Sequence, residues 1–209
     1  MKSLSILIPI YNEEESLQAL FDELKSSFEK NQSVEIIFIN DGSSDMSQKV
    51  IENEIANYST WKLINLYRNY GKSVALQSGI DIASNELIAT LDGDLQDDPK
   101  ELINLVRELN EDDVIVGWKK DRLDPLEKKI ASKIFNFFIK LFSGLKIKDS
   151  NSGLKVLKKE VAKSLNLYGG RHRYIPLLAH QKGFNVKEIP VNHRERKFGK
   201  SKYGAERYK

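Results

Sequence analysis

Apolar runs typical of β-strands alternate along the chain with segments whose apolar residues recur every three or four positions. Residues 4–10 form the first such run, and from Leu17 to Phe28 the apolar residues repeat at helical spacing. Strands that are apolar throughout and separated by helices are typical of a parallel sheet covered on both faces. The pattern predicts strands at residues 4–10, 34–39, 63–66, 86–91 and 114–116, with helices at 12–28, 45–58, 73–83 and from 98 onward.

Two predicted helix starts carry residues that commonly cap helices. Asn12 with Glu15 three positions later resembles a capping box. Asp98 followed by Pro99 places a capping carboxylate before a proline in the first turn. No internal repeat or low-complexity stretch interrupts the alternation. We therefore predict a single α/β domain over residues 1–209, with a mostly parallel central sheet and helices on both faces.

Polar residues follow each of the first four strands at the point where the strand ends. Parallel sheets of this kind bind ligands beyond the carboxyl ends of their strands. Because these ends meet at one edge of the sheet, we expect the polar segments to lie together there. The segments are residues 11–13, 40–43, 68–71 and 92–94.

Composition excludes some classes of protein and site. The chain contains no cysteine, which excludes a disulfide framework and a thiolate metal site. No stretch approaches the about 18 apolar residues of a membrane span, and the short apolar run at the N-terminus favours a strand over a signal peptide. The chain ends at Lys209 without a turn or helix cap, so we expect further segments beyond it, membrane-spanning ones among them.

Positive charge is concentrated in residues 171–209, which carry 11 Lys and Arg against three Glu. Such a segment is either a solvated tail or a basic face for phosphates, on a substrate or on anionic lipid. The three histidines are scattered, and His172, His180 and His193 favour surface or packing roles over metal binding.

The segment LDGDLQDDP, residues 91–99, carries the clearest chemistry. Asp92 and Asp94 flank Gly93 at a strand end, so two carboxylates can approach one point. Hard oxygen ligands without cysteine suit Mg²⁺ or Mn²⁺ shared with substrate phosphates. Asp-Gly-Asp also occurs in plain turns and calcium loops, but the spaced acids and terminal Glu of a calcium loop are absent.

The segment NDGSSD, residues 40–45, is a strand-to-helix turn with Asp41 at its tip. Its plain interpretation is a turn followed by a helix cap from Ser44 or Asp45. A carboxylate at such a strand end can also accept hydrogen bonds from a ribose or a base.

Taken together, the polar loops resemble glycosyltransferase family 2, in particular the polyprenyl-phosphate sugar synthases related to dolichol-phosphate mannosyltransferase. The resemblance runs in order through nearly the whole chain. Gln and Pro after the aspartates, as in DLQDDP, are typical of this branch. The matching segments are residues 8–17, 40–45, 68–83, 91–99, 149–161 and 189–204.

The resemblance implies a GT-A type fold and an inverting transfer of a sugar from a UDP- or GDP-linked donor to a polyprenyl phosphate. It implies a divalent ion, Mg²⁺ or Mn²⁺, and action at the cytoplasmic face of a membrane. By position, it assigns the base and ribose pocket to Pro9, Tyr11, Glu13 and Asp41, and the metal and diphosphate to Asp92, Asp94 and Gln96. It assigns a basic loop over the diphosphate to Arg196, Ser201 and Lys202.

Two positions depart from the pattern of the family. Asn40 stands where many relatives have a second Asp, which leaves the identity of the base open. Lys133 stands where many have Arg, so a phosphate there would meet a point charge without the bidentate fork.

Residues 118–142 combine apolar residues at helical spacing with several lysines. This pattern fits either a core-facing helix with solvated lysines or a helix in the membrane interface. The resemblance makes Arg122 and Lys133 candidates to bind the lipid phosphate.

The expected chemistry is departure of a nucleoside diphosphate, whose negative charge the metal ion, Arg196 and Lys202 would stabilise. A phosphate acceptor is largely ionised near neutral pH. A general base is therefore less necessary than for a hydroxyl acceptor, and Asp149 is the candidate if there is one. Two alternatives stay open: a family 2 enzyme acting on a saccharide, and a basic module that binds nucleic acid or membrane without catalysis. The aspartates argue against the module, so we expect no nucleic-acid partner.

Overall fold

The computed structural model describes residues 2–28, 31, 33–119, 144–145, 147–192 and 194. Strands and helices alternate through the first part of the chain, as predicted, with β1 (Leu4–Ile10), α1 (Glu14–Phe28), β2 (Val34–Asn40), α2 (Ser47–Ile55), β3 (Trp61–Asn65), α3 (Lys72–Ile82), β4 (Leu87–Thr90), α4 (Pro99–Glu108) and β5 (Val114–Lys119). The later elements are β6 (Lys155–Lys158), α6 (Lys159–Ser164), the 3₁₀ helix η1 (Arg171–Tyr174), α7 (Ile175–Gln181) and β7 (Val186–Val191).

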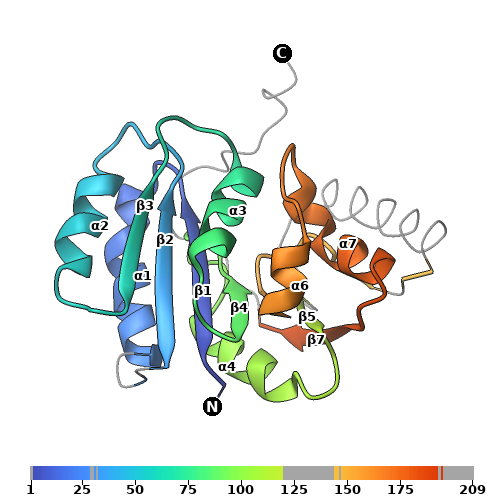
Figure 1. Cartoon of the computed structure of the whole chain (residues 1–209). Coiled ribbons are helices and arrows are strands. Elements are labelled where there is room, and N and C mark those ends of the chain that lie inside the picture. The colour runs from blue at the N-terminus through green and yellow to red at the C-terminus, as the bar shows by residue number, and fades with distance from the viewer. Residues whose placement is uncertain are drawn as a thin grey trace.

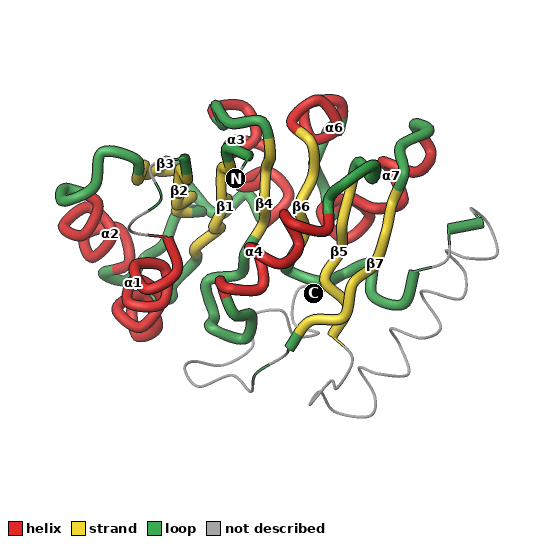
Figure 2. The backbone as a smooth tube through the Cα atoms, turned by 90° about the horizontal axis from the view of Figure 1, so that it is seen from below, coloured by secondary structure: helices red, strands yellow, loops and turns green. Residues whose placement is uncertain are grey.

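The strands form one seven-stranded sheet in the order β3-β2-β1-β4-β6-β5-β7 (Figures 1 and 2). Among the described strands, β6 alone runs antiparallel to its neighbours, β4 on one side and β5 on the other. The remaining pairings are parallel. The carboxyl ends of β1, β2, β3 and β4 therefore meet at one edge of the sheet, the upper edge in Figure 1.

Helices cover both faces of the sheet, and the side chains of β1 show why. Ile6 and Ile8 pack in one apolar cluster with α1 and α4, whereas Leu7 packs in a second cluster with α3, α6 and α7. Successive strand residues point to opposite faces, so a strand that is apolar throughout needs cover on both sides. Figure 2 shows the two helical layers on either side of the strands. The predicted α/β class and mostly parallel sheet are confirmed; the extent of the domain stays a prediction.

Of the two predicted helix caps, the structure confirms one and corrects the other. Asp98 caps α4 as predicted, since its carboxylate accepts a hydrogen bond from the Lys100 amide at 3.0 Å. The predicted capping box at Asn12 is wrong, because Asn12 Oδ1 accepts from the Ser44 amide at 2.7 Å instead. The start of α1 is bonded from the neighbouring loop: the Glu14 amide donates to Asp45 at 3.2 Å, and Glu14 accepts from the Met46 amide at 2.7 Å.

The second predicted helix is shorter than expected, Ser47–Ile55 rather than residues 45–58. Asp45 is used as an acceptor for the Ser47 and Glu14 amides, which keeps it outside the helix.

Among the described residues, no helix has the length and apolar character that would let it cross a membrane. The predicted amphipathic helix at 118–142 lies almost wholly outside the described residues.

Candidate active site

The site is built at the strand carboxyl ends, beginning with Asp41 after β2. Its buried carboxylate accepts hydrogen bonds from the Tyr70 and Gly71 amides, at 2.7 and 2.9 Å. Gly42 follows with a φ of +67°, and a Cβ there would lie 2.3 Å from the Arg68 carbonyl carbon. Asp41 therefore ties the loop after β2 to the loop after β3. Its predicted contact with a ribose or base stays a prediction.

Asn40, which stands where many members of the resembled family have Asp, cross-links the same strand ends. Its side-chain amide donates to Asn65 Oδ1 on β3 at 3.0 Å, and its Oδ1 accepts from the Ser43 amide at 3.0 Å. An amide supplies a donor and an acceptor at once, which a carboxylate cannot do. Asn40 is thus part of the scaffold under the loop.

The loop after β1 packs against both neighbouring loops. Pro9 is the half-buried penultimate residue of β1, and Tyr11 follows the strand. The Glu13 amide donates to Ser47 Oγ at 3.0 Å, and Ser16 Oγ donates to the Gly93 carbonyl at 3.1 Å. The residues predicted to line a nucleotide pocket therefore share one edge of the sheet with the aspartate loop.

The aspartate loop, residues 92–98, follows β4 and is held closely against β1. A Cβ on Gly93 would lie 2.5 Å from Ile10 Cδ1, so only glycine fits there without displacement. Asp94 Oδ1 accepts from the Gln96 amide at 3.1 Å, and Leu95 between them has a φ of +60°. Asp92, Asp94 and Gln96 are each half-buried, so their side chains border the surface of the sheet edge.

Two lysines lie against this loop. The Lys72 ammonium, at the start of α3, forms an ion pair with Asp92 Oδ1. Lys119, at the end of β5, forms a buried ion pair with Asp97 at 2.9 Å. Burial alone would raise the pKa of Asp92, but Lys72 outweighs it and the pKa falls to about 2. Asp92 is therefore a carboxylate at neutral pH.

A third lysine, Lys155, lies buried at the start of β6 and donates to the Ser152 carbonyl oxygen. Burial, followed by the charge of Lys72, lowers the pKa of Lys155 to about 8. For Lys119 burial also acts to lower the pKa, yet Asp97 raises it above its ordinary value. The pKa of each of these two buried lysines, like that of Asp92, therefore depends on the charges of its neighbours.

Residues 149–153, the glycine-ended loop before β6, lie directly against the aspartates. A Cβ on Gly153 would come within 2.6 Å of Asp97 Oδ2 and 2.8 Å of Asp92 Oδ2. Thr90 Oγ1 donates to the Gly153 carbonyl at 2.6 Å. At the other end of the loop, the Asp149 amide donates to Glu188 of β7 at 2.6 Å, and burial raises the pKa of Glu188.

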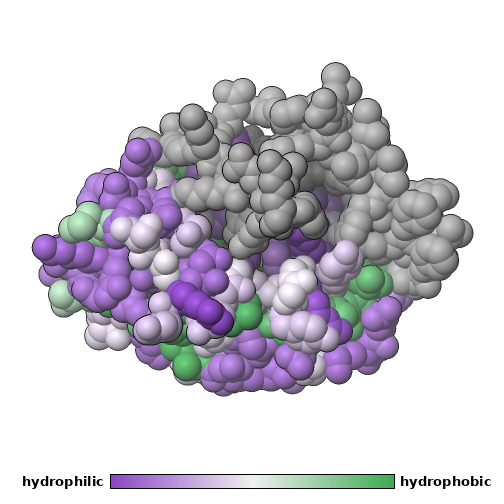
Figure 3. All heavy atoms as spheres, turned by 90° about the horizontal axis from the view of Figure 1, so that it is seen from above, coloured by the Kyte–Doolittle hydropathy of each residue, from purple (hydrophilic) through white to green (hydrophobic). Residues whose placement is uncertain are grey.

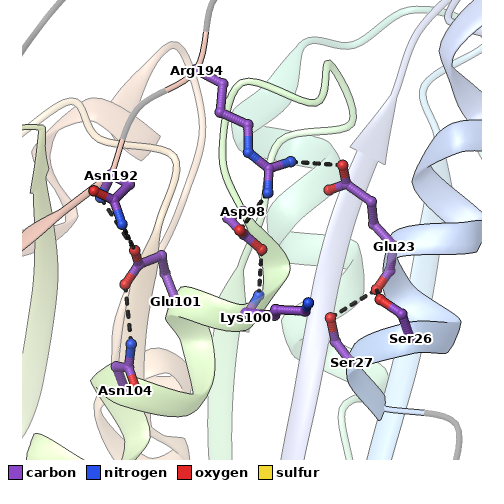
Figure 4. Close-up of polar contacts among 9 residues, drawn as sticks. All are labelled: Glu23, Ser26, Ser27, Asp98, Lys100, Glu101, Asn104, Asn192 and Arg194. Atoms are coloured by element: carbon purple, nitrogen blue, oxygen red, sulfur yellow. Dashed lines mark hydrogen bonds and ion pairs between the residues drawn. The ribbon is translucent and has the colours of Figure 1, made fainter.

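The end of the described chain reaches the same loop (Figure 4). The Arg194 amide donates to the Gln96 carbonyl at 3.0 Å. Its guanidinium bridges Glu23 of α1, at 2.6 Å, and Asp98. Asn192 donates to Glu101 of α4 at 2.7 Å. The chain that leads to the predicted basic loop therefore begins beside the aspartates.

The structure brings most of the predicted residues to one edge, and several lie outside its description. Pro9, Tyr11, Glu13, Asp41, Asp92, Asp94 and Gln96 belong to strand ends or the loops that follow them, and Asp149 lies in the loop before the antiparallel β6. Figure 3 looks onto this face, where hydrophilic residues are prominent. Arg122, Lys133, Arg196, Ser201, Lys202 and His193 lie outside the described residues.

The sequence reasoning missed the lysines and the close approach of Gly153. Lys72 follows a glycine at a strand-to-helix turn, which is the one local signal that could have indicated it. Lys119 and Lys155 carry no such signal, because they reach the aspartates only through the pairing of β6 with β4 and β5.

The donor set fits a divalent ion that shares its ligands with a diphosphate. Within the described chain no three acidic or histidine side chains group as a metal cage. Mg²⁺ at nucleotide sites is commonly held by one or two carboxylates plus substrate phosphates, and does not need such a cage. Asp92 and Asp94, two residues apart in one loop, offer two such carboxylates.

Comparison with known proteins identifies the family. Residues 5–165 match the model described as Glycosyl transferase family 2. The chain belongs to this family. The predicted resemblance and fold class are thereby confirmed.

Two curated family 2 relatives are similar over almost the whole chain. Dodecaprenyl-phosphate galacturonate synthase of Rhizobium johnstonii is 36% identical over 211 residues, covering 98% of this chain and 62% of the relative. Undecaprenyl-phosphate 4-deoxy-4-formamido-L-arabinose transferase of Yersinia pestis is 36% identical over 208 residues, covering 97% and 63%. The chain thus spans a little under two thirds of the length of these relatives.

Solved structures share the fold. A mannosyltransferase from Pyrobaculum calidifontis, in complex with GDP-Man and Mn²⁺, superposes with a TM-score of 0.73 at 15% identity. The match covers 99% of this family 2 chain and 59% of the other.

Proposed function

We propose that this family 2 chain is the catalytic part of an enzyme that transfers a sugar from a nucleoside diphosphate sugar to a polyprenyl phosphate. The observation that carries the proposal is the ion pair of Asp92 with Lys72, in a loop against which residues 149–153 are packed. Both curated relatives are named for transfer to a polyprenyl phosphate. The proposed place of action is the cytoplasmic face of a membrane.

Asp92 and Asp94 would hold Mg²⁺ or Mn²⁺, with Gln96 beside them. The ion would neutralise charge that develops on the departing diphosphate. Lys72 and Lys155 add fixed positive charge at the same strand ends, and charge that is already in place needs no reorganisation during the reaction. Arg196, Ser201 and Lys202 are proposed to complete this environment from the basic loop that follows Arg194.

The donor base and ribose are proposed to lie over the loops after β1 and β2, against Pro9, Tyr11, Glu13 and Asp41. Asp41 holds the loop after β3 in place through its hydrogen bonds to the Tyr70 and Gly71 amides. The diphosphate would then extend along the sheet edge toward Asp92. The base of the proposed donor is that of UDP or GDP, which is uracil or guanine.

The acceptor phosphate is proposed to bind near Arg122 and Lys133 and to attack the anomeric carbon directly, with inversion. An ionised phosphate oxygen is already a nucleophile, so positioning by cations matters more than removal of a proton. Asp149 is only 1% exposed. Its proposed role as a base would therefore require residues 149–153 to move.

Thermal shift with nucleotide sugars tests the donor half of the proposal. UDP-glucose, UDP-galacturonate and GDP-mannose would be added to the protein with and without Mn²⁺. We expect at least one to raise the melting temperature, and more so with Mn²⁺, since a ligand at 100 times its Kd stabilises by about 2.7 kcal/mol. No shift with any of them would contradict the proposal.

A comparison of acceptors tests the acceptor half of the proposal. With the donor found above, undecaprenyl phosphate should accept the sugar, and undecaprenol, which lacks the phosphate, should not. Equal transfer to a simple saccharide would instead assign the chain to the saccharide-acting members of family 2.

A further inference from the structure

His172 and Ser73 form a pair beside the aspartate loop that the proposed mechanism does not use. Ser73 is the second residue of α3, directly after Lys72, and is buried. Its Oγ lies 2.9 Å from Nδ1 of His172 in η1 and accepts a hydrogen bond from the His172 backbone amide at 3.0 Å. One serine therefore holds both the backbone and the ring of a histidine 99 positions away.

The two hydrogen bonds determine which ring nitrogen carries the proton. Ser73 Oγ already accepts the backbone N–H, so its own hydroxyl proton is directed at Nδ1. In the opposite tautomer, Nδ1 would donate and the buried hydroxyl proton would have no acceptor among the described residues. A buried unsatisfied donor costs about 1–3 kcal/mol. The imidazole is therefore held with its proton on Nε2.

The ring is neutral and lies in the electrostatic field of the proposed active site. Burial, followed by the charges of Lys72, Lys155 and Arg173, lowers the pKa of His172 to about 3, while Asp92 acts in the opposite direction. A neutral imidazole has one donor and one acceptor. Its acceptor is used by Ser73, and within the described chain no hydrogen bond joins Nε2 to another residue.

We propose that His172 is a sugar-binding residue, whose Nε2–H donates a hydrogen bond to an oxygen of the transferred sugar, and that Ser73 is the positioning residue that holds its ring and tautomer. The inference rests on the proposed function and adds to it a contact with the donor sugar. A neutral N–H orients the sugar through a directional hydrogen bond and adds no charge to the site. The positive charge that the diphosphate needs is proposed to come from Lys72 and Lys155. The ligand group is a sugar hydroxyl or carboxylate oxygen.

Long-range ¹H–¹⁵N NMR on the ¹⁵N-labelled protein tests the tautomer and the contact. The chain has only three histidines, and the spectrum of His172→Gln identifies the His172 signals. At neutral pH we expect an unprotonated Nδ1 and a protonated Nε2. The reverse tautomer, or a charged ring, would overturn the inference.

The same spectrum then locates the ligand. Saturating nucleotide sugar should shift the His172 Nε2 signal, and the nucleoside diphosphate alone should not. If both ligands shift it equally, or if it stays in place although the nucleotide sugar raises the melting temperature, His172 does not contact the sugar. Failure of the proposed function looks different, because no nucleotide sugar would raise the melting temperature at all.

Steady-state kinetics with a set of donors that share one base and differ in the sugar provide the second readout. His172→Ala should lower kcat/KM about tenfold, the effect of one neutral hydrogen bond, and by different factors for different sugars. His172→Gln, which keeps an N–H at similar reach, should recover part of the loss. Ser73→Ala should lower kcat/KM and mix the two tautomers in the NMR spectrum.

The matched control is His180→Gln on α7, away from the strand carboxyl ends, which should leave kcat/KM and donor preference unchanged. An equal loss for every sugar in His172→Ala would indicate a structural role and contradict a contact with the sugar.

Discussion

Asp92 and Asp94 differ in their surroundings although one glycine separates them. Asp92 is paired with Lys72, which keeps its pKa near 2, and the Gly153 position lies against its carboxylate. Asp94 accepts a hydrogen bond from the Gln96 amide within its own loop. A change at Asp94 leaves both members of the Asp92–Lys72 ion pair in the chain, which makes Asp94 the clearer test of the metal role.

We expect Asp94→Asn to lower kcat at least about 100-fold, the loss seen when one group that stabilises developing charge is removed. The melting temperature without ligand should stay within a few degrees of that of the wild type. Asp22→Asn, an exposed residue on α1, is the matched control and should be fully active. Turnover at the wild-type rate in Mn²⁺-buffered assays would remove Asp94 from the metal site.

At the scale of elements, residues 149–153 depend on strands that are distant in the chain. Thr90 of β4 binds the Gly153 carbonyl, and Glu188 of β7 binds the Lys148 and Asp149 amides. The loop is held from both sides and presses Gly153 against the aspartates. This contact leaves no room for a larger side chain.

Gly153→Ala should therefore impair both catalysis and stability. The new methyl group would meet Asp97 Oδ2 and Asp92 Oδ2 at less than 3 Å, so the carboxylates or the loop must shift. We expect a loss of about 1–3 kcal/mol in the free energy of unfolding, measured with urea, and a drop in kcat of tenfold or more. Asn151→Ala, an exposed position in the same loop, should change neither. An active Gly153→Ala would show that the geometry of the loop is unimportant.

At the scale of the whole molecule, a second polar cluster lies at the opposite edge of the sheet. Glu35 of β2 is buried there and forms an ion pair with Lys62 of β3. It also accepts hydrogen bonds from Ser5 of β1 at 2.6 Å and from the Ser84 hydroxyl, just after α3, at 3.0 Å. One carboxylate thus joins three strands and the end of a helix, far from the proposed chemistry.

This cluster should make stability depend on pH. Burial acts to raise the pKa of Glu35, but the bonds from Lys62, Ser5 and Ser84 outweigh it, and the pKa lies below its ordinary value of 4.5. Because the folded state binds the proton more weakly, the stabilisation is present above pH 4.5 and is lost as the pH falls through the lowered pKa. Glu35→Gln should cost about 1.5–3 kcal/mol at pH 7 in urea unfolding, and less at pH 3.

Glu111→Gln, at an exposed position, is the control for this measurement and should follow the wild type at both pH values. A difference between Glu35→Gln and the wild type that is the same at pH 7 and pH 3 would mean that the charge of Glu35 does not contribute. Activity at neutral pH should persist in Glu35→Gln, since the cluster is remote from the aspartate loop.

Prediction from sequence succeeded where the signal is local. The runs at β1, β2, β3, β4 and β5 are visible in the chain, and so are Asp98 before Pro99 and the paired aspartates. Asn12 was wrongly predicted as part of a capping box, because its side chain bonds a loop 32 residues away. A capping motif read from near neighbours fails when the side chain bonds a residue that is distant in the sequence and close in the fold.

The sequence by itself determined the alternation of strands and helices and the acidic loop at a strand end, because these depend on spacing between near neighbours. It also carried the resemblance to the family, through motifs that run in order along nearly the whole chain. Only the tertiary structure decided which cations meet those acids. The antiparallel β6 enters the sheet between β4 and β5, and this order brings Lys119, Lys155 and Gly153 to the aspartates. The packing of η1 against α3 places His172 beside Ser73. These contacts join residues up to 99 positions apart, and their proximity follows from strand order and helix packing, which hydrophobic periodicity does not encode.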